Sequence, residues 1–305
     1  MICLIVKSDF DGYGLYTLTA GDLEVSVTEL GAAVTRLRWR GRTLSLGYET
    51  AAEYLAGQSY LGAIVGRFAN RIGGGAFELN GRRYELVKNE GGNTLHGGGA
   101  FNKRRWQSAV EGERVVFTLF SPDGDLGFPG DLTARVVYST ANDALRIDFE
   151  AAAAADTVYA PTTHMYFNLD GSDDIRGHVL QMDAAGVLEI DGSLIPTGTI
   201  LPAAGDFDFS APRLIGRDYD HCFPLRDETA CRVSAGGVRL TLTTDFPAVQ
   251  FYTGAFLENA IGANRGFAVE PEFFPDSPNR PEFPSAVLKA GERFRKYAEY
   301  RFEAV

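Results

Sequence analysis

Short segments in which apolar and polar residues alternate, separated by glycine-containing turns, restrict the fold of this chain more than any other feature. They are rich in Val, Leu, Thr, Phe and Tyr and occur at 23–30, 115–120, 132–139, 145–150 and 238–244. A period of two residues is typical of strands with one buried face. Helical periodicity is nearly absent, and 51–56 is long enough for about one turn. The pattern therefore predicts a large antiparallel β-sandwich or β-barrel.

Local signals predict two hairpins. Asn80-Gly81 lies between two alternating segments in 77–86, and this dipeptide favours a type I′ turn because both residues accept positive φ. A second hairpin is expected over 132–150, with its turn near Asn142-Asp143. The alanine run 151–155 has high helix propensity, but five residues are too few to form a stable helix alone.

Length and charge limit the class of protein. The 305 residues are expected to form one domain, 1–305, because all-β folds of this size often form single units. The net charge is −11 and the pI is about 4.9. Nucleic acid and anionic membranes both require a basic surface, so neither is an expected partner.

Cysteine usage and the N-terminal residues indicate a cytoplasmic protein. Cys3, Cys222 and Cys231 are odd in number and form no Cys-x-x-Cys pair, as expected of reduced thiols. The apolar run 1–6 is too short for a signal peptide and lacks a basic segment. No stretch of about 18 apolar residues could span a membrane. No Gly-x-Gly-x-x-Gly loop precedes a helix, so no nucleotide cofactor is expected.

Several segments that interrupt the strand pattern are polar, aromatic and punctuated by Gly or Pro. Functional groups concentrate in such irregular segments. Their candidate site residues are Arg67, Asn70, Arg71, His96, His164, Asp220, His221, Gln250 and Glu270. Nearby aromatic residues that could pack on the C–H faces of a sugar are Phe68, Trp106, Phe167 and Tyr252. Hydrogen-bonding groups together with flat apolar faces indicate a monosaccharide as the partner.

A carboxylate and an imidazole could interconvert the anomers of such a sugar. A base removes the proton of the C1 hydroxyl, and an acid protonates the ring oxygen as the C1–O5 bond breaks. Each such acid or base typically accelerates the reaction by ~10²–10⁴-fold. The usual pKa values of about 4.3 for Glu and about 6.5 for His must then move toward the working pH. We expect burial to raise the pKa of the Glu and a neighbouring carboxylate to raise that of the His.

The residues alone leave several interpretations open. A histidine in a Gly-rich turn is more often structural. Asp220 could begin a turn, and Glu270 could end an exposed strand; Arg67 and Arg71 could form a solvated face. Three histidines and two carboxylates could bind a metal, but no His-x-His or His-Glu-x-x-His spacing exists, so no metal is expected.

Six segments in collinear order carry a family resemblance. They are 66–72 (GRFANRI), 93–98 (NTLHGG), 127–130 (GFPG), 164–169 (HMYFNL), 219–223 (YDHCF) and 270–279 (EPEFFPDSPN). Each is weak alone, but together they resemble the aldose 1-epimerase (galactose mutarotase) family over nearly the whole chain.

The resemblance implies an all-β β-supersandwich of large antiparallel sheets, with a sugar bound in a cleft and no cofactor. It implies that Glu270 is the general base at the C1 hydroxyl and His164 the general acid at the ring oxygen. His96 is implied to bind the sugar and to stabilise charge near that oxygen. The residues implied to bind substrate are Asn70, Arg71, Asp220 and Gln250.

Departures from the family pattern bear on which sugar is bound more than on the reaction at C1. Thr163 and Arg280 stand where the family often has Asn and His, and the stretches 220–250 and 250–270 are short. Glu272 is the nearest rival to Glu270 as the base.

Three further functions are compatible with the sequence. A phosphorylated or sulfonated hexose could be the substrate, bound by a cationic pocket built from Arg67, Arg71, Arg265 or Arg280. A glycosidase could use Asp220 as a second carboxylate. The protein could also bind a sugar without catalysing any reaction.

Overall fold

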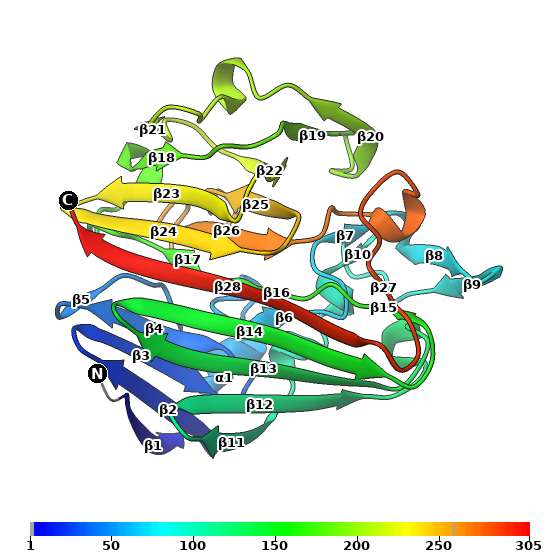
Figure 1. The fold of residues 1–305 in the computed structure, drawn as a ribbon, viewed down its shortest axis with the longest axis horizontal. Coiled ribbons are helices and arrows are strands. Elements are labelled where there is room, and N and C mark those ends of the chain that lie inside the picture. The colour runs from blue at the N-terminus through cyan, green and yellow to red at the C-terminus, as the bar shows by residue number, and fades with distance from the viewer. Residues whose placement is uncertain (1–2, 259) are drawn as a thin grey trace.

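Antiparallel β-sheets make up almost all regular structure of the protein (Figure 1). The computed structural model describes residues 3–258 and 260–305. Met1, Ile2 and Asn259, which belong to the expected domain 1–305, lie outside the described residues, and the first two begin the N-terminal apolar run. The predicted all-β class is confirmed.

The largest sheet in the described chain has nine strands. In spatial order these are β11 (Gln107–Glu111), β12 (Arg114–Ser121), β13 (Leu132–Ala141), β14 (Ala144–Ala153), β28 (Arg293–Ala304), β24 (Val238–Thr244), β23 (Thr229–Ala235), β18 (Val179–Gln181) and β21 (Arg213–Leu214). Strand β28 pairs with β14 on one side and with β24 on the other, so it joins the two halves of the sheet.

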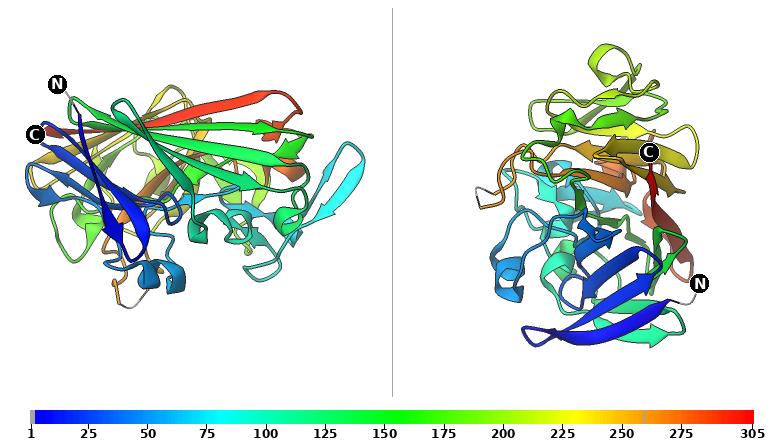
Figure 2. Two further views of the ribbon diagram at one scale, coloured as in Figure 1. Left: turned by 90° about the horizontal axis from the view of Figure 1, so that it is seen from below. Right: turned by 90° about the vertical axis from the view of Figure 1, so that its left-hand side faces the viewer.

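Two smaller sheets form a second layer on one side of the nine-stranded sheet (Figure 2). The first contains β1 (Leu4–Phe10), β2 (Tyr13–Ala20), β3 (Leu23–Thr28), β4 (Val34–Trp39) and β5 (Arg42–Thr43). The second contains, in spatial order, β17 (Tyr166–Phe167), β26 (Phe267–Glu272), β25 (Ala248–Tyr252) and β22 (Asp220–Pro224). The main core lies between the layers, since Val25, Val136 and Phe251 from the three sheets belong to one buried cluster.

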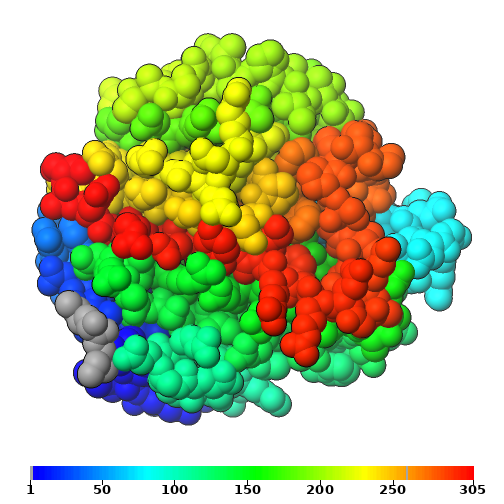
Figure 3. Space-filling view, in the orientation of Figure 1, coloured from blue at the N-terminus to red at the C-terminus, as the bar shows by residue number. Residues whose placement is uncertain are grey.

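Five short strand pairs of the described residues lie outside these sheets. They are β6 (Ile64–Val65) with β16 (Thr162–Thr163), β7 (Arg71–Ile72) with β10 (Thr94–Leu95), β8 (Ala76–Leu79) with β9 (Arg82–Glu85), β15 (Thr157–Val158) with β27 (Val287–Leu288), and β19 (Val187–Ile190) with β20 (Pro196–Leu201). Single 3₁₀ turns lie at Gly73–Gly75, His96–Gly98, Phe101–Lys103, Asp125–Gly127, Ile175–Gly177, Gly205–Phe207 and Ser277–Asn279. The β8–β9 hairpin projects from the body of the molecule (Figure 3).

Both predicted hairpins are confirmed. Leu79 pairs with Arg82 across Asn80-Gly81, whose φ values of 52° and 74° are those of a type I′ turn. The hairpin of β13 and β14 turns at Asn142-Asp143, and both of these residues also have positive φ. The start of the alanine run continues β14 as far as Ala153, because pairing with β28 outweighs its helix propensity.

The α-helix α1 (Ala51–Ala56) is the single turn that the sequence predicts, and a capping box begins it. The Thr50 hydroxyl accepts a hydrogen bond from the Glu53 N–H, and the Glu53 carboxylate accepts one from the Thr50 N–H. Within residues 3–258 and 260–305, no helix is long and apolar enough to cross a membrane.

Arg67 is a buried cation that holds together the loops beneath the segment 66–72. Its side chain is 2% exposed, and burial lowers its pKa to about 10. The guanidinium donates hydrogen bonds of 2.8 Å to four carbonyl groups, those of Ser121, Pro122, Pro129 and Gly130. The interpretations of Arg67 as part of a solvated face or of a cationic pocket are therefore wrong.

Replacing Arg67 with Met should lower the free energy of unfolding by about 3–5 kcal/mol, because four buried carbonyls lose their donor. Urea unfolding followed by circular dichroism measures this change. The control is Arg36→Met on β4, where the arginine is exposed and the loss should stay below about 0.5 kcal/mol. Equal losses in the two variants would contradict a structural role for Arg67.

Candidate active site

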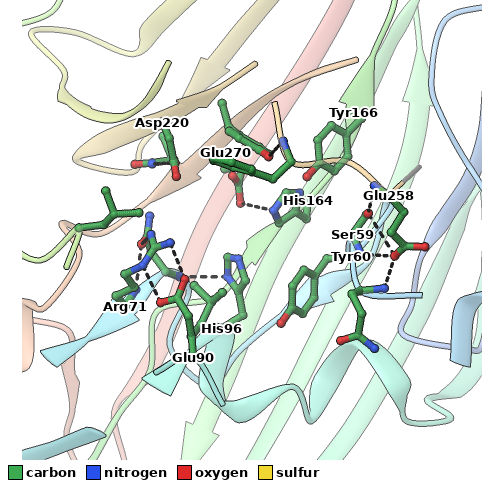
Figure 4. A pocket seen from close by; sticks show the side chains of 17 residues that line it. Ser59, Tyr60, Arg71, Glu90, His96, His164, Tyr166, Asp220, Glu258 and Glu270 are labelled. Carbon is green, nitrogen blue, oxygen red and sulfur yellow. Dashed lines mark hydrogen bonds and ion pairs between the residues drawn. The ribbon is translucent and has the colours of Figure 1, made fainter. Parts of the chain in front are cut away.

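A polar pocket with a volume of about 340 Å³ contains the predicted site residues. This volume is typical of sites for small molecules. The seven residues predicted for catalysis and substrate binding all line the pocket: Asn70, Arg71, His96, His164, Asp220, Gln250 and Glu270. Figure 4 shows the side chains of five of them, Arg71, His96, His164, Asp220 and Glu270, converging from several elements of the chain.

The alternation of strands β25 and β26 determines which residues face the pocket. Phe251 and Val269 belong to the main core. Their neighbours Gln250 and Glu270 are paired across the two strands and point to the opposite face. The pocket therefore lies on the face of the four-stranded sheet that is turned away from the nine-stranded sheet.

His164 and Glu270 form a close, buried pair. The Nε2 atom of His164 lies 3.6 Å from Oε2 of Glu270, and the two side chains are 5% and 3% exposed. Glu270 Oε2 and Gln250 Oε1 are buried and accept no hydrogen bond from the described residues. Unpartnered buried acceptors of this kind are rare in proteins and suit a ligand that supplies hydroxyl donors.

Burial controls the protonation of this pair. It lowers the pKa of His164 to about 4. Burial, together with the carboxylates of Glu272 and Asp220, raises the pKa of Glu270 well above 4.5. The expectation that a neighbouring carboxylate raises the pKa of the histidine is wrong, because desolvation by burial is the largest cause and lowers it. The expected rise for Glu270 is confirmed, so its carboxyl group keeps its proton to a higher pH than an ordinary glutamate does.

His96 is held in one tautomer by the backbone of Asn70. Its Nδ1 accepts a hydrogen bond of 3.1 Å from the Asn70 N–H, so its proton is assigned to Nε2. Burial and the nearby His164 lower the pKa of His96 well below 6.5, which keeps the ring neutral. His96 can therefore donate a hydrogen bond through Nε2, and it is poorly suited to act as a base.

Arg71 and Asp220 line the pocket in hydrogen-bonded positions. The Arg71 guanidinium forms a bidentate pair with Glu90, with distances of 2.8 and 2.7 Å. Asn70 Oδ1 accepts further bonds from the Arg71 backbone and guanidinium. Asp220 Oδ1 accepts a bond of 2.5 Å from Gln250 Nε2. These pairs fix polar groups at separate points around a small ligand.

His96, His164 and Glu270 each offer one potential metal ligand within 4.8 Å of the others. Spacing motifs in the sequence could not reveal this cluster, because its three residues come from segments that are distant along the chain. The cluster fits a metal poorly, since the Asn70 N–H occupies Nδ1 of His96 and the proton occupies Nε2. The arrangement suits hydrogen bonding to a ligand better than metal coordination.

Several residues named from the sequence lie outside the pocket. Phe68, Trp106 and Phe167 are fully buried in the core, and of the four aromatic residues proposed to pack on a sugar, Tyr252 alone lines the pocket. His221 lies beside it, where its Nδ1 accepts the Asp220 N–H.

Glu272, the rival of Glu270 as the base, does not have the contacts expected of that role. The same holds for Arg265 and Arg280, which were candidates for a cationic pocket. Glu272 is fully buried beneath the pocket, where it accepts a hydrogen bond of 3.3 Å from Asn70 Nδ2. Arg280 donates to the carbonyls of Pro196 and Thr197, and Arg265 pairs with Asp173. None of these three side chains lines the pocket among the described residues.

Tyr60, Glu90 and Glu258 were not predicted from the sequence, yet all three line the pocket, as does Tyr166. Tyr60 and Glu90 each lie within a few residues of a glycine in segments that interrupt the strands, which is a weak signal. Glu258 belongs to the short stretch 250–270, and nothing local distinguishes it.

Comparisons with known proteins agree with this fold and pocket. The family profile described as aldose 1-epimerase matches residues 14–301. The galactose mutarotase of Bos taurus is 36% identical, over 94% of this chain and 93% of the bovine protein. The aldose 1-epimerase of Escherichia coli (strain K12) is 35% identical, over 90% of this chain and 93% of the relative.

A solved structure supports the same assignment. The GalM/aldose epimerase homologue from C. elegans has a TM-score of 0.92 and 28% identity, over 96% of this chain and 99% of that one. The expected supersandwich fold is thereby confirmed. This chain belongs to the aldose 1-epimerase family.

Proposed function

We propose that this protein is an aldose 1-epimerase that interconverts the α and β anomers of a neutral aldose. The observation that carries the proposal is the buried His164–Glu270 pair, which lines a polar pocket of suitable volume. Anomerisation needs one proton acceptor and one proton donor on the same hemiacetal, and this pair supplies both.

In the proposed mechanism, Glu270 accepts the proton of the C1 hydroxyl while His164 protonates the ring oxygen. This mechanism requires a proton on His164 and a charged Glu270 when the sugar is bound. A sugar hydroxyl that donates a hydrogen bond to Glu270 favours its charged form, and this charge, 3.6 Å from Nε2 of His164, favours the protonated imidazole. The C1–O5 bond breaks, the open aldehyde rotates about C1–C2, and ring closure reverses both transfers. His96 donates from Nε2 near the ring oxygen, where negative charge develops.

Substrate binding is assigned to the remaining polar groups. Arg71 and Asn70 donate to sugar hydroxyls, while Asp220 accepts from them. Gln250 Oε1, which accepts no bond from the described residues, takes a further hydroxyl close to Glu270. Tyr252 offers an apolar face to the sugar ring.

The charge of the pocket favours a neutral sugar over an anionic one. Arg71 is the one cation among the described lining residues, and Glu90 already neutralises it. Three further carboxylic groups, those of Asp220, Glu258 and Glu270, line the same space. A phosphate or sulfonate would meet repulsion there rather than a cationic site.

Glycoside hydrolysis and sugar binding without catalysis are less well supported by the pocket. In a glycosidase, a second carboxylic acid would act with Glu270, whereas the titratable group in contact with Glu270 is His164. A protein that only bound sugar would not need this buried acid–base pair. The relatives named as galactose mutarotases suggest galactose as the first sugar to test.

We also propose that the protein acts in the cytoplasm. Its three cysteines, Cys3, Cys222 and Cys231, are free and buried, as suits a reducing compartment.

Glu270→Gln and His164→Asn should each reduce kcat for mutarotation of α-galactose by about 10²–10⁴-fold, because each removes one proton transfer. Polarimetry on freshly dissolved sugar measures this rate after subtraction of the spontaneous reaction. The exposed Glu113→Gln variant is the control, and circular dichroism checks the fold of all three. A rate close to that of the unmodified protein in either pocket variant would refute the assigned roles.

The pH dependence of kcat/KM should show an acidic limb close to pH 4. The active form carries one proton on the His164–Glu270 pair. This form disappears at low pH, when both groups bind a proton, and the pKa of His164 is about 4. The rate should therefore be constant from about pH 5 up to the raised pKa of Glu270. An acidic midpoint near the usual histidine pKa of about 6.5 would contradict this, provided that the fold persists over the range.

Hexose 6-phosphates should be poor substrates. For galactose 6-phosphate, kcat/KM should be at least about tenfold below that for galactose, which corresponds to about 1.4 kcal/mol of repulsion. Polarimetry on both sugars at equal ionic strength makes the comparison. A preference for the phosphorylated sugar would instead support an anionic hexose as the substrate.

A further inference from the structure

Tyr60 contacts both pocket histidines. Its ring stacks on His164 with a centroid distance of 5.8 Å and an interplanar angle of 18°. It meets His96 edge to face at 4.7 Å and 64°. On the other side of His164, Tyr166 stacks at 4.9 Å and 26°, so the imidazole lies between two tyrosine rings (Figure 4).

Packing of the hydrophobic core does not explain this position. Tyr60 is half-buried, lines the pocket, and belongs to none of the hydrophobic clusters formed by the described residues. The aromatic rings within contact distance of it are the imidazoles of His96 and His164. The contacts of Tyr60 therefore point to the reacting groups rather than to the core.

The backbone at Tyr60 is strained, and hydrogen bonds hold it in place. Its φ of 56° is unusual for a bulky residue and marks a position fixed by its surroundings. The Tyr60 carbonyl accepts the Ala63 N–H at 3.0 Å, and the His164 carbonyl accepts the Gly62 N–H at 2.9 Å. The turn that carries Tyr60 is thus bonded directly to the backbone of His164.

Glu258 fixes the residues that precede this turn. Its Oε1 accepts hydrogen bonds from the backbone N–H of Gln58 and from the N–H and hydroxyl of Ser59, the latter two at 3.0 and 3.2 Å. The Tyr48 hydroxyl donates to the same oxygen at 2.9 Å. One carboxylate in the stretch between β25 and β26 therefore binds a segment almost two hundred positions earlier in the chain.

We infer that Tyr60 is a positioning residue for the proposed epimerase reaction: it holds His164 and His96 in their reactive orientations, and Glu258 holds the turn that presents it. The inference rests on the proposed function. Stacking fixes the plane of the His164 ring, so that Nε2 stays directed at Glu270. The negative face of the tyrosine ring also favours the protonated imidazole that must donate to the ring oxygen.

The test compares Tyr60→Phe with Tyr60→Leu. Both side chains fill the position and exclude water, but only Phe keeps an aromatic face. Tyr60→Phe should keep kcat within about threefold, whereas Tyr60→Leu should lower kcat about 10–100-fold with a smaller change in KM, as expected of misplaced reacting groups. Tyr84→Leu is the matched control, since it removes another half-buried, stacked tyrosine from the distant β8–β9 hairpin.

A second measurement does not depend on activity. In NMR titrations, the His164 imidazole should have a lower pKa in Tyr60→Leu than in Tyr60→Phe, because the aliphatic side chain offers no negative face to the cation. If the unmodified protein shows no mutarotation, the proposed function fails, and this titration still decides whether Tyr60 acts on His164. Equal kcat and equal His164 titration in the Phe and Leu variants would overturn the inference.

The role of Glu258 is tested in the same assay. Glu258→Ala should lower kcat, and its combination with Tyr60→Leu should lower kcat by less than the product of the two separate effects, because both act through one turn. Multiplicative effects, or an unchanged kcat in Glu258→Ala, would show that Glu258 does not act through Tyr60.

Discussion

The two-residue alternation of strands β25 and β26 is the constraint on which the rest of the protein depends. One face of these strands carries Phe251 and Val269 into the core against the nine-stranded sheet, and the other carries Gln250 and Glu270 into the pocket. A shift of one residue in register would exchange the two faces. The packing of the core therefore sets the position of the reacting carboxylate, and the loops add the histidines around it.

The same arrangement places acidic groups where water cannot solvate them. Glu270 and Glu272 lie two residues apart on one strand face, both buried, and burial raises the pKa of each. Charged forms are unfavourable at such positions, so the site lowers the stability of the fold while it raises the pKa values of these carboxyl groups. The bonds of Asn70 to Glu272 and to His96 tie this strand to the loop that carries the second histidine.

Local features of the fold were predictable, and long-range ones were not. The turn at Asn80-Gly81 depends on the φ preferences of two adjacent residues, so the sequence alone predicts it. The pairing of Leu145 with Tyr300 depends on the whole chain, and no local pattern indicates it. Six of the seven pocket residues lie in the motifs of a known family, and the seventh, Gln250, lies in another segment that interrupts the strand pattern. Tyr60 and Glu258 lie outside those motifs, and the pKa of His164 depends on burial that only the assembled pocket creates.

Strand β28 lies between β14 and β24, although it is the last strand of the described chain. During synthesis, the two halves of the nine-stranded sheet therefore leave the ribosome before the strand that joins them. Until that strand arrives, β14 and β24 each present an open edge able to pair with other chains. A growing chain would remain exposed to misassembly until β28 is released, so chaperones that shield strand edges would matter most after β24 has emerged and before β28 has.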